Sequence, residues 1–210
     1  MGSQSVVEQI YLIRHGETAW SRSGQHTGRT DVPLTERGEL QAKHLRGLLR
    51  AIRFSQVLAS PLQRARRTCE LAGLGAAMRV EQNLSEWDYG QYEGLTNAQI
   101  RTQHADWDVF RDGCPGGEST AHMCARVDAL LSQLRAMPGR VALFSHGHFL
   151  RALAVRWIEL PLLRGRHFGL DAGAVSMLGY EHDNVHEPAI ELWNAVSNEL
   201  FDLVPHEQRG

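Results

Sequence analysis

Two short apolar segments of this chain each end in a histidine followed by a glycine, and they constrain its fold more than any other feature. The first runs from Ile10 to Ile13 and continues as Arg14-His15-Gly16. The second, Val141 to Ser145, continues as His146-Gly147 and opens into a segment with apolar residues at helical spacing. A short apolar run closed by glycine predicts a buried strand. Because ligands of open α/β sheets bind beyond the carboxyl ends of the strands, we expect both imidazoles in one crevice.

The residues beside the first histidine suit an anionic ligand. A histidine next to an arginine at a strand end can act as a nucleophile toward an anionic group, and Gly16 lets the backbone turn sharply and approach that group closely. One such segment alone is more often an ordinary strand end. The second histidine segment favours the functional interpretation, because it predicts two imidazoles in the same crevice.

A third segment predicts a positively charged helix start. Gln56 to Ala59 has the pattern of a short strand, and Ser60-Pro61 after it is typical of an N-cap followed by proline in the first helical position. Arg64 then falls in the first turn of the helix. The positive end of the helix dipole and the guanidinium would favour an anion at the same place.

Other segments are expected to supply the core. Thr35 is the expected N-cap of a helix with an apolar face made of Leu40, His44 or Leu45, Leu48, Leu49 and Ile52. A second apolar stripe, from Met123 to Leu134, is typical of a buried helix. Ala174 to Tyr180 and Pro188 to Trp193 predict two strands. The polar segment between them, 181–187, has the composition of a metal cluster but the context of a hairpin turn, and we favour the turn.

Four segments, taken in order, resemble the histidine phosphatase superfamily, the phosphoglycerate-mutase-like enzymes. They are Arg14 to Thr18, Ser60 to Thr68, Glu86 within Leu84 to Gly94, and Ser145 to Gly147. The resemblance covers most of the chain. It implies an α/β fold of three layers, α/β/α, with a mostly parallel central sheet and helices on both faces, formed by a single domain over residues 1–210. Residues 96–117 match the region where family members carry a cap that sets substrate choice, and the cap here is short.

The resemblance also implies roles for five side chains. His15 is the nucleophile and forms a phosphohistidine, while Glu86 donates a proton to the leaving group. Arg14, Arg64 and His146 supply positive charge around the phosphate. No metal and no cofactor is needed in this scheme.

A loop after the first strand is expected to cover the pocket. Ala19 to Asp31 lacks apolar periodicity, and in the resembling family it contacts the substrate phosphate. Ser21 stands where many members carry Asn, and Thr27 and Gly28 match positions whose hydroxyl and backbone N–H face the substrate. His148 either lines the pocket and meets substrate hydroxyls or a second phosphate, or touches only solvent.

Several stretches resemble the sedoheptulose-1,7-bisphosphatase branch more than the mutases, among them Trp20 to Gly28, Glu86 to Gly90 and Tyr180 to Val185. This implies a metal-independent phosphatase acting on a sugar phosphate or sugar bisphosphate. Two alternatives stay open: a phosphoglycerate mutase, which uses the same residues, and a non-catalytic phospho-ligand-binding protein on the same fold. A metallohydrolase is disfavoured, because the 11 histidines include no HExxH spacing.

Composition agrees with one ordinary domain, since 42% of the 210 residues are hydrophobic and 22% are charged. A formal charge of -2 gives no basic field, so neither nucleic acid nor a membrane is expected as a partner. The expected partner is a small phosphorylated molecule, and a homodimer stays open because family members are often dimers. No signal peptide is visible, no apolar run reaches about 20 residues, and the cysteines Cys69, Cys114 and Cys124 show no CxxC spacing. We therefore expect a cytoplasmic protein with Met1 to Ser5 as a disordered leader.

Overall fold

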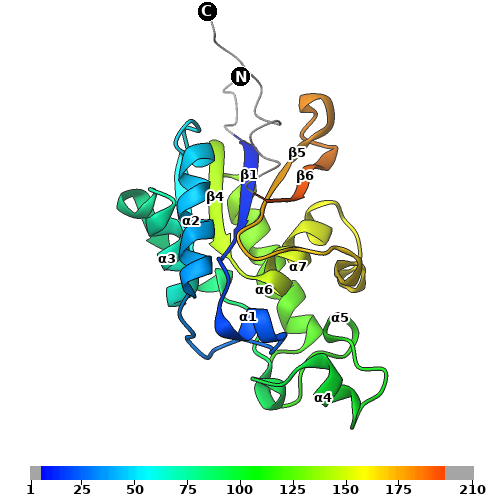
Figure 1. Cartoon of the computed structure of the whole chain (residues 1–210). Coiled ribbons are helices and arrows are strands. Elements are labelled where there is room, and N and C mark those ends of the chain that lie inside the picture. Colours follow the sequence, from blue (N-terminus) through cyan, green and yellow to red (C-terminus); the bar gives the residue numbers. More distant parts are fainter. Residues whose placement is uncertain (1–5, 197–210) are drawn as a thin grey trace, which may run out of the picture.

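A mostly parallel six-stranded sheet lies at the centre of the part of the chain that the structure describes, which confirms the predicted α/β class (Figure 1). The computed structural model describes residues 6–196, so the leader expected at residues 1–5 lies outside the described residues. The strands are β1 Val7–Arg14, β2 Gln56–Ala59, β3 Met78–Val80, β4 Gly139–Ser145, β5 Val175–Tyr180 and β6 Pro188–Ala195. Their order in the sheet is β3-β2-β4-β1-β5-β6.

The strand directions bring the two histidine segments together. β1 is parallel to β4, and β4 to β2, which in turn is parallel to β3. β5 is antiparallel to both β1 and β6. In the register of β1 and β4, Arg14 lies opposite Ser145. His15 and His146, the next residues along, therefore leave the sheet side by side at its carboxyl edge.

Helices cover both faces of the sheet, as the three-layer prediction requires (Figure 1). α2 (Glu36–Leu49) and α3 (Gln63–Leu71) lie on one face, and α6 (Thr120–Arg135) and α7 (Gly147–Trp157) lie on the other. Alternate residues of β1 face opposite ways. Ile10 and Leu12 belong to the core cluster that contains the buried residues of α6 and α7, and Tyr11 and Ile13 to the cluster beneath α2 and α3.

The predicted start of α2 is correct, and the predicted start of α3 is wrong. Thr35 is the N-cap of α2, and its side chain accepts a hydrogen bond from the N–H of Gly38. Ser60 is not the cap of α3, because the helix begins at Gln63 after an N-cap residue, Leu62, that makes no side-chain capping bond. The expected apolar face of α2 is wrong at Leu40, which is 54% exposed because it points away from the sheet.

Short elements gather beyond the carboxyl ends of the strands (Figure 1). They include α1 Ala19–Ser23, α4 Asn97–Arg101 and α5 Val109–Asp112. The chain also has short 3₁₀ helices, which are η1 Gly75–Ala77, η2 Gln82–Leu84, η3 Gly90–Tyr92, η4 Leu162–His167 and η5 Glu181–Asp183. The loop expected from Ala19 is wrong in its first five residues, because Thr18 and Ser21 form a capping box that starts α1.

Three further observations concern residues 6–196. No helix within them has both the length and the apolar character needed to cross a membrane. The polar segment 181–187 joins the antiparallel strands β5 and β6, which confirms the hairpin interpretation. No group of three His, Cys, Asp or Glu side chains in this part of the chain is arranged to hold a metal ion.

Candidate active site

His15 lies just past the carboxyl end of β1, and its hydrogen bonding decides which ring nitrogen can react. The side chain is buried, and Nδ1 lies 2.7 Å from the carbonyl oxygen of Gly16. A carbonyl oxygen only accepts, so Nδ1 carries the proton and the lone pair of Nε2 is left free. Burial, followed by the charges of Arg64 and Arg14, lowers the pKa of His15 well below its ordinary value. The imidazole is therefore neutral near pH 7, the state in which Nε2 is a nucleophile.

Gly16 is required for packing of the protein itself. A Cβ on Gly16 would overlap the backbone carbonyl of Gly38 in α2. The Gly16 N–H donates to Thr68 Oγ1 at 3.1 Å, and Thr68 lies in α3. The close approach that the sequence led us to expect toward a ligand is therefore made to α2, and it fixes the turn that carries His15.

Arg14 places a guanidinium beside His15 with a buried donor left unsatisfied. Its Nη1 donates to the carbonyl oxygen of Leu170. Its Nε is buried and has no hydrogen-bond partner among the described residues. A Cβ on Gly147 would lie 3.3 Å from the guanidinium carbon, so a larger residue there would crowd Arg14. A buried donor without an acceptor is costly, and a bound anion would supply that acceptor.

Arg64, in the first turn of α3, is fully buried and binds the protein with most of its donors. Nε donates to Nδ1 of His146 at 3.1 Å. The two terminal nitrogens donate, at 2.9 to 3.0 Å, to the carbonyl oxygens of Thr27, Gly28 and Thr30. Arg64 thus ties the loop after α1 to the end of β4. Its charge still reaches His15, where it is the largest cause of the lowered pKa after burial.

His146 has both ring nitrogens engaged by the protein. Because Nδ1 accepts from Arg64, Nε2 carries the proton, and it donates to Ser60 Oγ at 2.7 Å. Burial lowers the pKa of His146 well below its ordinary value, with Arg64 as the next cause. The ring centroid lies 5.2 Å from that of His15. The positive charge expected of His146 is therefore wrong for this arrangement: the ring is neutral and braces Arg64.

The Glu86 carboxylate lies over the N-terminus of α7. Oε1 accepts from the N–H groups of Trp87 and Phe149 at 2.9 Å each, and Oε2 accepts from the N–H of His148 at 3.0 Å. Backbone N–H groups and the helix dipole favour a carboxyl group at this place. The predicted proton donor is thereby held at the N-terminus of α7, which begins immediately after His146.

A cavity of about 240 Å³ brings three of the five predicted catalytic side chains together. Arg14, His15 and Glu86 line it, whereas Arg64 and His146 lie behind His15 in contact with each other. The remaining lining residues come from α1 and the loop after it, from the residue before η3, from the start of α4, from α7 and from the segment between η4 and β5. They are Ser21, Gly24, Gln25, His26, Thr27, Tyr89, Asn97, Gly147, His148, Arg151 and Leu170.

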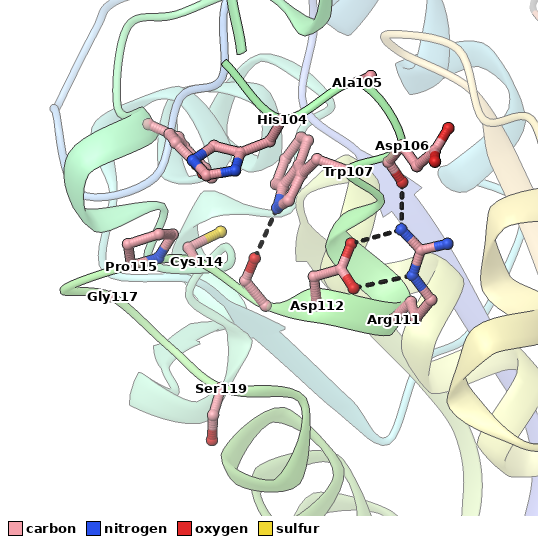
Figure 2. A pocket seen from close by; sticks show the side chains of 12 residues that line it. His104, Ala105, Asp106, Trp107, Arg111, Asp112, Cys114, Pro115, Gly117 and Ser119 are labelled. Atoms are coloured by element: carbon pink, nitrogen blue, oxygen red, sulfur yellow. Dashed lines mark hydrogen bonds and ion pairs between the residues drawn. The ribbon is translucent and has the colours of Figure 1, made fainter. Parts of the chain in front are cut away.

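A larger cavity of about 560 Å³ opens in the cap, where Figure 2 shows its walls. Two of its charged groups pair with each other: Arg111 Nε donates to Asp112 at 2.8 Å. Burial raises the pKa of Cys114 on its wall to about 12, so this thiol stays protonated at neutral pH. The smaller cavity is lined by His15, which has a free ring nitrogen, and by Arg14, which has an unsatisfied donor, so we assign the active site there despite its size.

Of the three loop residues predicted to bind substrate, two line the cavity and the third does not. Ser21 and Thr27 line the cavity, but the Ser21 hydroxyl accepts from Thr18 N–H at 2.9 Å and donates to the Thr18 carbonyl at 3.1 Å. The Gly28 N–H, expected to face the substrate, donates to the Glu93 carboxylate at 2.9 and 3.0 Å. In this arrangement Gly28 is a packing residue, because a Cβ there would meet the Trp87 carbonyl at 2.5 Å.

His148 lines the cavity, in agreement with the functional alternative for this residue. Four other lining residues escaped the sequence analysis: His26, Tyr89, Asn97 and Arg151. Arg151 offered a signal, because it follows His148 by three residues on α7 and so shares its face. His26 lies in the loop that was expected to cover the pocket, but nothing in the sequence singled it out, and its contact with Asn97, the first residue of α4, forms only in the folded chain.

The comparisons with known proteins agree with this geometry. Residues 10–196 match the model of the histidine phosphatase superfamily (branch 1). The chain is 45% identical over 178 residues to an acid phosphatase of Mycobacterium tuberculosis, covering 83% of this chain and 87% of the relative. It is 31% identical over an alignment of 252 residues to the sedoheptulose 1,7-bisphosphatase of Saccharomyces cerevisiae, covering 90% of this chain and 93% of that protein.

The fold has a solved counterpart from the same mycobacterium. The structure of the product of open reading frame Rv3214 of Mycobacterium tuberculosis superposes with a TM-score of 0.83 at 40% identity, covering 90% of this chain and 98% of that one. At this identity the likeness extends beyond the fold.

Proposed function

Because the chain belongs to the histidine phosphatase superfamily and is a phosphoric monoester hydrolase, we propose that it hydrolyses a small phosphorylated sugar through a phosphohistidine on His15. One observation carries the proposal. His15, which has a free imidazole nitrogen, and Arg14, whose buried Nε is unsatisfied, line the same cavity. A phosphoryl group supplies an electrophile for the first and acceptor oxygens for the second.

The first half of the reaction transfers the phosphoryl group to the protein. His15 Nε2 attacks phosphorus, and the ester P–O bond breaks on the opposite side. Arg14 faces the phosphoryl oxygens, and Arg64 adds positive charge from behind the His15 ring. Glu86, in its protonated form, donates its proton to the departing ester oxygen, so the alcohol leaves neutral.

The second half releases inorganic phosphate. Glu86, now a carboxylate, takes a proton from water, and the water oxygen forms the new bond to phosphorus as the bond to Nε2 breaks. His15 returns to its neutral form with the proton still on Nδ1, because the Gly16 carbonyl holds that tautomer throughout. Every catalytic side chain in this cycle comes from the chain itself, and water is the other reactant.

Arg151 supports a substrate with a second anionic group. Its Nε donates to the Gly165 carbonyl at 3.0 Å, and its guanidinium lies 4.8 Å from the centre of the Phe110 ring. It lines the same cavity as Arg14, so the cavity has a second positive charge. A sugar bisphosphate would place one phosphate at each arginine, in line with the substrate named for the yeast relative.

The test is phosphate release by the purified protein, in the presence of a chelator, from sugar phosphates, sugar bisphosphates, phosphoglycerates and nucleotides. We expect release from a sugar phosphate or bisphosphate that disappears in His15→Ala and persists in His44→Ala, a variant of an exposed histidine on α2. Conversion of one phosphoglycerate into another without phosphate release would identify a mutase. Binding of these compounds without turnover would identify a phospho-ligand-binding protein, and loss of activity with chelator would refute the metal-independent mechanism.

A further inference from the structure

Two imidazoles, His26 and His148, stand beside each other on the wall of the active-site cavity, and the catalytic steps above use neither. Their ring centroids are 5.8 Å apart. Burial lowers the pKa of both rings. They are therefore neutral near pH 7, and each presents one N–H donor and one lone-pair acceptor.

Tyr89 sets the tautomer of His148. The Tyr89 hydroxyl lies 2.5 Å from Nδ1 of His148. Burial raises the pKa of Tyr89 well above its ordinary value, so the phenol keeps its proton. Among the described residues Nδ1 of His148 is the only hydrogen-bond partner of the Tyr89 hydroxyl, so we assign the phenol proton to this contact, with Tyr89 as the donor. The remaining proton of the imidazole is then on Nε2, and His148 offers a donor to the cavity.

Asn97 sets the opposite tautomer in His26. Nε2 of His26 lies 3.1 Å from Oδ1 of Asn97, an acceptor, so Nε2 carries the proton and donates. Nδ1 is left with a lone pair and has no hydrogen-bond partner among the described residues. The ring is held between Tyr89, with centroids 4.6 Å apart, and Trp107, at 5.4 Å. His26 therefore offers an acceptor.

A donor and an acceptor side by side match a group that both accepts and donates. A carboxylate or phosphate oxygen accepts only and would be repelled by the lone pair on His26, while an ammonium group donates only and would oppose the N–H of His148. An alcohol hydroxyl satisfies both. We propose that His26 and His148 together bind one hydroxyl group of the substrate and so select polyhydroxylated phosphate esters over esters of the same length without hydroxyls. This inference rests on the proposed function, because it concerns the leaving-group part of the same site.

The test compares two phosphate monoesters with the same carbon chain, sorbitol 6-phosphate and hexyl phosphate. Binding of each is measured by calorimetry to His15→Ala protein, in which turnover does not confound the affinity. We define the hydroxyl preference as the ratio of the two dissociation constants. One lost neutral hydrogen bond changes such a ratio by about tenfold or less, so we expect the informative variants to lower it by about three- to tenfold.

Matched substitutions separate substrate binding from support of the fold. An Asn side chain places an amide near the Nδ1 position of histidine, and a Gln side chain places one near Nε2. At position 148 we expect His148→Gln to retain the preference, since it still presents a donor to the cavity, and His148→Asn to lower it. At position 26 we expect the reverse: His26→Asn retains the preference and His26→Gln lowers it.

A purely structural role predicts the opposite order at both positions. His148→Asn preserves the contact with Tyr89, and His26→Gln preserves the contact with Asn97, so the variant that keeps the protein contact would be the harmless one. The proposal would be overturned by this opposite order, by an unchanged ratio in all four variants, or by a lack of binding of either ester. Failure of the proposed function is seen separately, as absence of phosphate release by the protein with His15 intact.

Discussion

The ends of β1 and β4 carry the same sequence signature, an apolar strand closed by His-Gly, yet the two histidines have different surroundings. At the end of β1, Nδ1 of His15 donates to a carbonyl and Nε2 is free. At the end of β4, Nδ1 of His146 accepts from Arg64 and Nε2 donates to Ser60. One ring is prepared to react, and the other is part of the scaffold.

The difference follows from what each strand end meets in the fold. β1 lies between β4 and β5, and the residues after it contact α2 and α3 through Gly16 backbone atoms. β4 lies between β1 and β2, so the residue after it is adjacent to Ser60, the first residue after β2. A hydroxyl and a guanidinium from one neighbouring segment thus occupy the second histidine. The same dipeptide therefore leaves one ring with a free nitrogen, the nucleophile we propose, and makes the other a support, according to the neighbouring strand.

Exchanging each histidine for asparagine gives the largest expected contrast. His15→Asn removes the attacking nitrogen, so we expect kcat/KM for the preferred ester to fall by about 10⁴-fold or more. His146→Asn retains an acceptor for Arg64 but loses the bond to Ser60, so we expect a loss of about 10²-fold. The measurement is steady-state kinetics, together with trapping of labelled phosphate on the protein in alkali. Equal losses in the two variants, or labelling of His15→Asn, would contradict the distinction.

The arginines next to these histidines provide the second contrast. Arg14→Lys keeps a charge but loses the planar donor pattern, and we expect about a hundredfold loss in kcat/KM with little change in the melting temperature. Arg64→Lys leaves buried carbonyls of the loop after α1 without donors, so we expect a similar loss of activity and also a clearly lower melting temperature. Arg67→Lys, on the exposed side of α3, is the matched control and should change neither. If Arg14→Lys destabilised the fold as much as Arg64→Lys, the two arginines would share one role.

Ser60→Ala tests the support of His146 by itself, and its expected effect on activity is smaller. It leaves the Nε2–H of His146 buried without an acceptor, which costs about 2 kcal/mol and lowers the melting temperature by about 6 °C for a chain of this size. We expect kcat/KM to fall about tenfold, because His146, which accepts a hydrogen bond from Arg64, is no longer held by Ser60. Ser55→Ala removes a hydroxyl whose bond to the Arg140 carbonyl is on the surface, and it serves as the control. A melting temperature unchanged in Ser60→Ala would mean that another acceptor replaces the hydroxyl.

Local patterns in the sequence were sufficient for the two strands that carry the histidines. The apolar run and its closing glycine predict β1 and β4, and the match of four segments to one superfamily identifies Arg14, Arg64 and Glu86 near them. Nothing local reveals which nitrogen of a histidine is free, because the partners of Nδ1 and Nε2 come from segments such as Ser60 that are distant in the chain. This is why a charge was expected on His146 and a helix cap at Ser60.

The cavity wall was the least predictable part of the site for the same reason. Arg151 was missed because only the apolar residues of α7 were considered, although its spacing from His148 places both on one face. His26 and Asn97 meet through a tertiary contact between the loop after α1 and the start of α4, and no periodicity relates them. In our proposals the residues predicted from family motifs act on the phosphate, whereas those found only in the structure act on the rest of the substrate.

The last and smallest expected effect is on the pH dependence of stability. Burial lowers the pKa of His146 well below its ordinary value, whereas a histidine in the unfolded chain titrates near about 6.5. Between these two values the unfolded state binds a proton that the folded state does not, so acidification favours unfolding. Stability should therefore be greatest above about pH 6.5 and decrease, by about 1.4 kcal/mol per pH unit for each such histidine, as the pH falls below it.

Comparison of variants isolates this contribution from that of the carboxylates, which also titrate as the pH falls. His146→Asn removes one buried neutral imidazole, so the dependence of the unfolding free energy on pH between about 6.5 and 5 should become shallower by about one proton. His44→Asn, at an exposed position on α2, should leave the slope as it is in the unaltered chain. His15 provides the same test at the other strand end, since burial lowers its pKa too. Although the two imidazoles differ in function, their effects on the pH slope should be alike, because the slope depends on the buried neutral state that they share and not on which nitrogen is free.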